Sequence, residues 1–186
     1  MISLIGNRPA LQIGRHQVID YDTGWIDDAL RRAARAADQS DFPFVDEIRR
    51  GVVQYLETRC PLKMMRLEEL YDRMRRMLEK IGCHGIAAKL QPLAPPVTFS
   101  LVRAAMDAGN GFELAFFETL RTELSNLRAA GVEEIRFSGL QESAMILRGT
   151  TKWNKHCQAM LAEIEAFLRT CAREESTTGI CAGGNP

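Results

Sequence analysis

Cysteine and histidine side chains supply the nucleophiles and metal ligands of many enzymes, and two Cys/His pairs are adjacent in this sequence. His156 and Cys157 fall in a predicted helix, where neighbours point about 100° apart, so they are not expected to act together as nucleophile and base. Cys83 and His84 offer two metal ligands, but the sequence has no second pair at zinc-site spacing. Neither pair therefore predicts a catalytic or a metal site.

Two other segments carry groups that bind phosphate. Gly109-Asn110-Gly111 lies between a predicted strand and the amino end of a predicted helix, where backbone amides and the helix dipole hold anions. It lacks the GKS or GxGxxG context of a phosphate loop, so a plain loop is the favoured interpretation. Arg148, Lys152 and Lys155 flank Trp153 and would contact phosphate beside an aromatic ring. Ordinary surface cations near a helix start explain them equally well.

The composition is that of an ordinary globular protein of one or two domains, with 46% hydrophobic and 26% charged residues among 186. Lys plus Arg and Asp plus Glu are both 24, so no strong overall field attracts nucleic acid or anionic lipid. The opening MISLIGNRP is too short for a signal-peptide core, and no apolar run approaches the roughly 20 residues that span a bilayer. We expect a cytoplasmic protein whose five cysteines, which form no CxxC pair, are reduced thiols.

Hydrophobic spacing predicts a hairpin and several helices in the first half. Two short strands, 11–13 and 17–19, are joined by a turn at 14–16. A capped helix follows over 25–37, and a helix of about 15 residues comes after the loop at 38–43. The stretch from Met65 to Leu90 then holds an amphipathic helix, a stop at a glycine and a second short helical turn. Its apolar stripe consists of Leu67, Leu70, Met74, Met77, Leu78 and Ile81.

This order of elements resembles the ATP-cone domain, the nucleotide-sensing module of ribonucleotide reductases and their repressor. The resemblance is carried by the Leu-Glu-Glu-Leu of 67–70, the Leu-Glu-Lys of 78–80, the stop residue Gly82 and the Ile-Ala-Ala-Lys-Leu of 86–90. Tyr21-Asp22 stands where the family has a Phe-Asp before its first helix. The resemblance covers roughly the first half of the chain. It implies a hairpin followed by four helices, with ATP or dATP as the ligand.

The ligand motif departs from the family. An ATP-cone usually has a Lys-Arg-Asp-Gly hairpin turn and a lysine early in its first helix, whereas this turn is Ile-Gly-Arg-His and Trp25 replaces the lysine. Arg15, one position late, would pair with a phosphate, His16 would donate when protonated, and Trp25 would stack on a base. The alternative is that Arg15 and His16 form a solvated turn and that Trp25 is a core anchor. Arg15, His16 and Trp25 are the nucleotide-site residues that the resemblance implies.

The chain is therefore expected to contain an ATP-cone-like helical domain over 1–90, a Pro-rich linker over 91–96, a small α+β domain over 97–172 and a disordered tail over 173–186. The second domain is predicted to have strands at 97–102, 132–137 and 144–148, a loop at 103–111, and helices at 112–130 and 153–170.

The sequence predicts a mainly helical α+β protein that is non-catalytic, and the resemblance implies a regulatory role. Its nucleotide-binding module would control homo-oligomerisation or a protein partner, without nucleic acid, metal or membrane. The alternative is a scaffold that has lost the nucleotide and uses Met64, Met65, Met74 and Met77 for contacts with partners or with itself. An enzyme with a site near 109–112 is least expected, because no nucleophile with a base, metal cluster or facing carboxylate pair is predicted.

Overall fold

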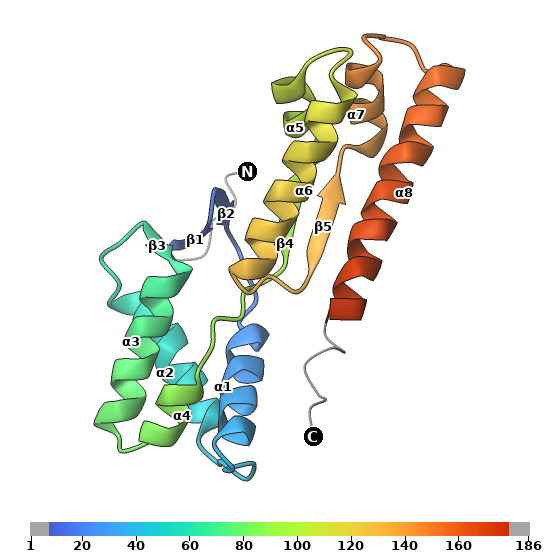
Figure 1. Cartoon of the computed structure of the whole chain (residues 1–186). Coiled ribbons are helices and arrows are strands. Elements are labelled where there is room, and N and C mark those ends of the chain that lie inside the picture. The colour runs from blue at the N-terminus through green and yellow to red at the C-terminus, as the bar shows by residue number, and fades with distance from the viewer. Residues whose placement is uncertain (1–7, 179–186) are drawn as a thin grey trace, which may run out of the picture. The chain divides into compact units, whose positions relative to one another are not determined.

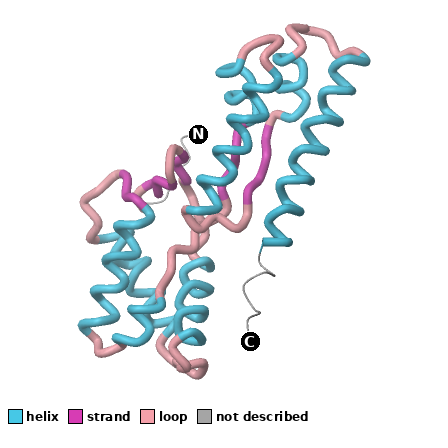
Figure 2. Tube along the Cα trace, in the orientation of Figure 1, coloured by secondary structure: helices cyan, strands magenta, loops and turns pink. Residues whose placement is uncertain are grey.

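The computed structural model describes residues 8–178, which form a mainly helical α+β fold with eight helices and five strands. Contacts within the chain divide it into two compact units. Unit 1 comprises residues 8–97 and 126–135, and unit 2 comprises residues 98–125 and 136–178. Strands are confined to one small sheet and one strand pair, and helices make up most of the rest (Figure 2). The chain therefore leaves unit 1, returns to it for one short segment and leaves it again.

A three-stranded sheet with the order β2-β1-β3 lies at one end of the helices of unit 1 (Figure 1). The predicted hairpin is confirmed, since β1 (Ala10–Ile13) pairs antiparallel with β2 (His16–Val18). The other edge of β1 pairs in parallel with β3 (Met64–Arg66), a strand that the sequence did not predict. Three residues are too few for alternation to be recognised, although only Met65, the middle residue of β3, is buried.

Four helices complete unit 1 in the predicted order: α1 (Gly24–Ala36), α2 (Val45–Thr58), α3 (Leu67–Lys80) and α4 (His84–Lys89). α1 packs against α2 and α4, and α3 packs against α4. The predicted stripe of α3 is buried at Leu67, Leu70, Met74 and Leu78. Ile81 does not belong to it, because the helix ends at Lys80 and the Ile81 side chain is exposed.

The Pro-rich stretch 91–96 is packed into unit 1. Leu93 and Ala94 are buried, and the Ala94 amide donates to the carbonyl of Gly131 at 2.9 Å. The Val97 amide likewise donates to the carbonyl of Glu134 at 3.0 Å. The prolines of this stretch have no backbone N–H, so the remaining amides are its backbone donors. The hydrogen bonds of Ala94 and Val97 hold the stretch against 126–135.

Unit 2 contains most of the strand pair β4 (Val97–Ser100) and β5 (Ile135–Ser138), together with the greater part of four helices. These helices are α5 (Leu101–Ala108), α6 (Glu113–Ala129), α7 (Leu140–Leu147) and α8 (Lys155–Thr178). α7 packs against both α5 and α8, and Phe117 of α6 lies 4.9 Å from Phe167 of α8 between ring centroids. The buried core of unit 2 combines the aromatic rings of Phe99 and Phe116 with aliphatic side chains such as Leu120, Leu147 and Ile164.

Two predictions for this region are wrong. Residues 103–108, predicted as a loop, belong to α5, because the Ser100 hydroxyl caps its first turn by accepting from the Arg103 amide and alanines favour the helix. Residues 144–147, predicted as a strand, belong to α7, where burial of Ser143, Ala144 and Leu147 follows a helical rather than an alternating pattern.

The last helix is longer than predicted. α8 continues to Thr178, so residues 173–178 of the expected tail are helical, whereas 179–186 lie outside the described residues. Leu114, in the first turn of α6, is exposed. None of the described helices is long and apolar enough to span a membrane.

Candidate functional site

The structure places the three predicted nucleotide-site residues in two environments. Arg15 is exposed in the turn between β1 and β2, and His16 begins β2. Trp25 is buried in the first turn of α1, where its indole N–H donates to the Asp22 carbonyl at 2.7 Å. Its ring lies beside Tyr21 and Tyr71, with centroids 6.4 and 6.2 Å away. These contacts favour the core-anchor interpretation of Trp25, while Arg15 and His16 are placed where a ligand can reach them.

A second basic region, which the sequence did not single out, lies between α2 and α3. We call it the α2–α3 groove, and its volume is about 570 Å³. Its lining residues are Gly51, Val52, Tyr55, Arg59, Leu70, Arg73, Met74, Arg76, Met77 and Lys80. Four of them are cationic and none is acidic, so the groove is electropositive as well as partly apolar.

Helical spacing explains why these side chains converge. On α2 and its carboxyl cap, Gly51, Tyr55 and Arg59 follow one another at four-residue intervals and therefore line one face. On α3, Arg73, Arg76 and Lys80 follow one another at intervals of three and four residues. Three apolar side chains that are buried lie between the two rows, namely Val52, Leu70 and Met74. The groove thus has an apolar floor and cationic walls.

Arg73 connects the two walls. Its guanidinium donates to the Tyr55 hydroxyl across the groove and to the Glu69 carboxylate at 2.6 Å on its own helix. The guanidinium carbon also lies 5.6 Å from the centroid of the Tyr55 ring. The Glu69 hydrogen bond is the main reason why the pKa of Arg73 is raised.

The remaining cations of the groove keep donors that no group within residues 8–178 accepts. Within residues 8–178, the side chains of Arg59 and Lys80 make no hydrogen bond or ion pair, and both are exposed. Arg76 donates only its Nε–H, to the Asp72 carbonyl at 3.2 Å. Each therefore keeps donors that can contact an anion entering the groove.

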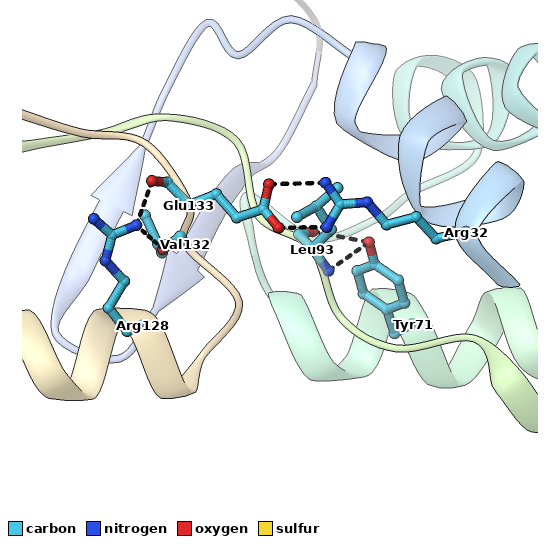
Figure 3. Close-up of polar contacts among 6 residues, drawn as sticks. All are labelled: Arg32, Tyr71, Leu93, Arg128, Val132 and Glu133. Carbon is cyan, nitrogen blue, oxygen red and sulfur yellow. Dashed lines mark hydrogen bonds and ion pairs between the residues drawn. The ribbon is translucent and has the colours of Figure 1, made fainter. Parts of the chain in front are cut away.

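A second hollow of about 530 Å³ lies among α1, the Pro-rich stretch and residues 128–133 of unit 1. Figure 3 shows that Arg32 and Glu133 of this hollow bind each other and that Arg128 binds backbone carbonyls. Both oxygens of the Glu133 carboxylate accept from Arg32, with a distance of 2.9 Å for the Nη2 contact, and Arg128 donates to the carbonyls of Val132 and Glu133. These contacts join α1 to 128–133, so we assign this hollow a structural role.

The candidates of the second half are placed in ordinary structural roles. Arg148 forms an ion pair with Glu113 at 3.1 Å, and Cys157 is fully buried in the core. The Gly111 amide, in the glycine loop, donates to the Leu147 carbonyl at 3.1 Å. Trp153 remains exposed beside Lys152 and Lys155.

The sulfur-containing side chains also have defined places. Cys60, Cys83 and Cys157 are free thiols and Cys171 is half-buried, while Cys181 lies outside the described residues. No three His, Cys, Asp or Glu side chains within residues 8–178 are grouped to hold a metal ion. Among the four methionines of the scaffold alternative, Met65 and Met74 are buried and Met64 is exposed, so they do not share one surface.

The sequence contained a signal for the α2–α3 groove. Arg73, Arg76 and Lys80 lie on the polar side of an amphipathic helix, and their spacing places them in one row beside the apolar stripe. The contribution of α2 could not be foreseen, because it depends on how two helices pack. No family model, curated protein or solved structure matches this chain.

Proposed function

We propose that the protein is a non-catalytic regulatory protein whose unit 1 is an ATP-cone-like module that binds ATP or dATP. The observation that supports this proposal is the arrangement of unit 1, in which a hairpin is followed by four helices in the order that the resemblance implies. The exposed Arg15 in the hairpin turn offers a cationic donor to a triphosphate, and His16 lies next to it in the chain.

Regulation requires that the nucleotide bind one state of the protein more tightly than another. In this proposal the two states differ in oligomeric state or in affinity for a protein partner, and nucleotide binding shifts the balance between them. A catalytic step is not part of the proposal.

The test is calorimetric titration of the full chain with ATP, dATP and ADP in magnesium buffer, combined with its mass by light scattering. We expect nucleotide-dependent heat, a change of mass, and weaker binding by Arg15→Ala. Arg35→Ala, which removes an exposed arginine from the last turn of α1, is the matched control and should bind normally. An unchanged mass and no heat would refute the regulatory proposal and favour the nucleotide-independent scaffold.

A further inference from the structure

We propose that the α2–α3 groove is a binding site for a polyphosphate-bearing ligand, such as a nucleoside polyphosphate. This site goes beyond the proposed function, because the groove is lined only by residues of α2, its carboxyl cap and α3 and includes nothing from the hairpin.

The positive charge of the groove favours a negatively charged ligand. Its walls carry Arg59, Arg73, Arg76 and Lys80, and no carboxylate lines it. Among the described residues, an acid neutralises only Arg73 of these four cations, namely Glu69 at 2.6 Å. An occupant with several negative charges would therefore meet more positive charge than the protein itself balances.

The arrangement of the cations selects several phosphates rather than one. Arg76 and Lys80 are one helical turn apart on α3, and Arg59 stands on the opposite wall. A linear chain of phosphates can contact cations that are spread along a groove, whereas a single phosphate reaches only a few of them. The guanidinium groups on both walls have paired N–H donors, which can contact two oxygens of a tetrahedral phosphate group at once.

The apolar floor of the groove favours a ligand that carries an apolar group beside its phosphates. Val52, Leu70 and Met74 are buried beneath the cations, and the half-buried Met77 stands beside them. Gly51 leaves open space where any other residue would place a Cβ, since no atom lies within 4 Å of that position. A flat, largely apolar group such as a nucleobase can therefore lie on the floor at the Gly51 end, and the volume of about 570 Å³ is in the range of small-molecule sites.

Binding of inorganic triphosphate and of ATP to the full chain, measured by calorimetry, tests this site directly. The variant Arg76→Glu/Lys80→Glu reverses the charge of two groove cations that form no ion pair within the described residues. We expect it to bind triphosphate at least about tenfold more weakly, because a hydrogen bond between a cation and a phosphate contributes more affinity than a neutral hydrogen bond. Binding by the wild type should weaken as salt is added.

The control variant is Arg31→Glu/Arg35→Glu on α1. It makes the same change of charge at the same four-residue spacing, and its second residue also lies in the last turn of its helix. Both control residues are exposed and lie outside the groove. Equal urea midpoints and circular dichroism spectra would establish that both variants fold.

Loss of triphosphate binding in the groove variant alone would support the site. No binding by the wild type at millimolar triphosphate, or equal losses in both variants, would overturn it.

The proposed function can fail separately from the groove site. If ATP changes neither the mass nor the partner affinity while the groove variant still loses triphosphate binding, the groove site stands without the regulatory module. If Arg15→Ala loses nucleotide binding and the groove variant binds both ligands normally, the nucleotide-binding module stands and the groove site is refuted.

Discussion

The hydroxyl of Tyr71 is hydrogen-bonded to both backbone groups of Leu93. It accepts from the Leu93 amide at 2.9 Å and donates to the Leu93 carbonyl at 2.8 Å (Figure 3). Burial raises the pKa of Tyr71, so the phenol keeps the proton that it donates. One side chain of α3 thus satisfies two polar groups of a Pro-rich stretch that has no ladder or helix to satisfy them.

Replacing Tyr71 by Phe should lower the free energy of unfolding by about 1–3 kcal/mol, since it leaves a buried amide and a buried carbonyl unpaired. Tyr55→Phe is the matched control. The Tyr55 hydroxyl accepts from Arg73 at the edge of a groove, where water can replace it. Tyr55→Phe should therefore lower the free energy of unfolding by less than Tyr71→Phe. Urea unfolding of the full chain measures both variants, and equal losses would contradict the special role of the Tyr71 hydroxyl.

Gly131 is expected to tolerate no side chain. Its φ is +89°, and a Cβ there would lie 2.4 Å from the Pro92 carbonyl oxygen. Gly131→Ala should therefore destabilise the protein by roughly 3 kcal/mol or more, from strain together with the clash.

Gly82→Ala separates these two causes. Gly82 has nearly the same φ, +86°, but a Cβ would meet no atom within 4 Å, so only the conformational cost of about 1–2 kcal/mol is expected. Thermal or urea unfolding of the two variants gives the comparison. A loss in Gly131→Ala no larger than in Gly82→Ala would mean that the contact with Pro92 relaxes freely.

Local periodicity predicted most of unit 1. The stripes of α1, α2 and α3 extend over several turns, and their buried positions agree with the spacing, as in Leu67, Leu70, Met74 and Leu78 of α3. The hairpin was also predictable because Gly14, with φ +57°, lies in the turn between two alternating segments. In these elements each local preference agrees with the final fold.

Other features depend on contacts that the sequence pattern does not contain. β3 pairs with the free edge of β1, and hydrogen bonds with Tyr71 and Gly131 help to hold the Pro-rich stretch. Short helices such as α7 have too few residues for a periodic signal. The α2–α3 groove required the positions of two helices, so its α3 row was visible in the sequence and its α2 wall was not.

The ion pair between Arg32 and Glu133 should make stability depend on pH in the acidic range. The hydrogen bond from Arg32 is the main reason why the pKa of Glu133 is lowered in the folded protein. A carboxyl with a lowered folded pKa stabilises the protein above its unfolded pKa, and that contribution is lost as the pH falls through the folded value. Both side chains are more than half exposed, so the contribution at neutral pH should stay below about 1 kcal/mol.

Glu133→Gln should therefore unfold at lower urea than the wild type at neutral pH, and the difference should disappear once the carboxyl is protonated. Glu118→Gln serves as a control, because Glu118 is exposed and forms no ion pair within the described residues. A difference between Glu133→Gln and the wild type that persists unchanged in acid would show that the ion pair is not its cause.

A chain that ends at residue 97 should be less stable than unit 1 in the full protein, because unit 1 includes 126–135. Such a fragment lacks the acceptor for the Ala94 amide, the partner of Arg32 and the buried side chain of Val132. Fluorescence of Trp25 during urea unfolding reports on unit 1, provided that the full chain carries Trp153→Phe at its exposed second tryptophan. We expect a lower midpoint for the fragment and recovery when 126–135 is appended through a Gly/Ser linker. Identical midpoints for the fragment and the full chain would mean that 1–97 folds as a complete domain and that the return segment contributes nothing to it.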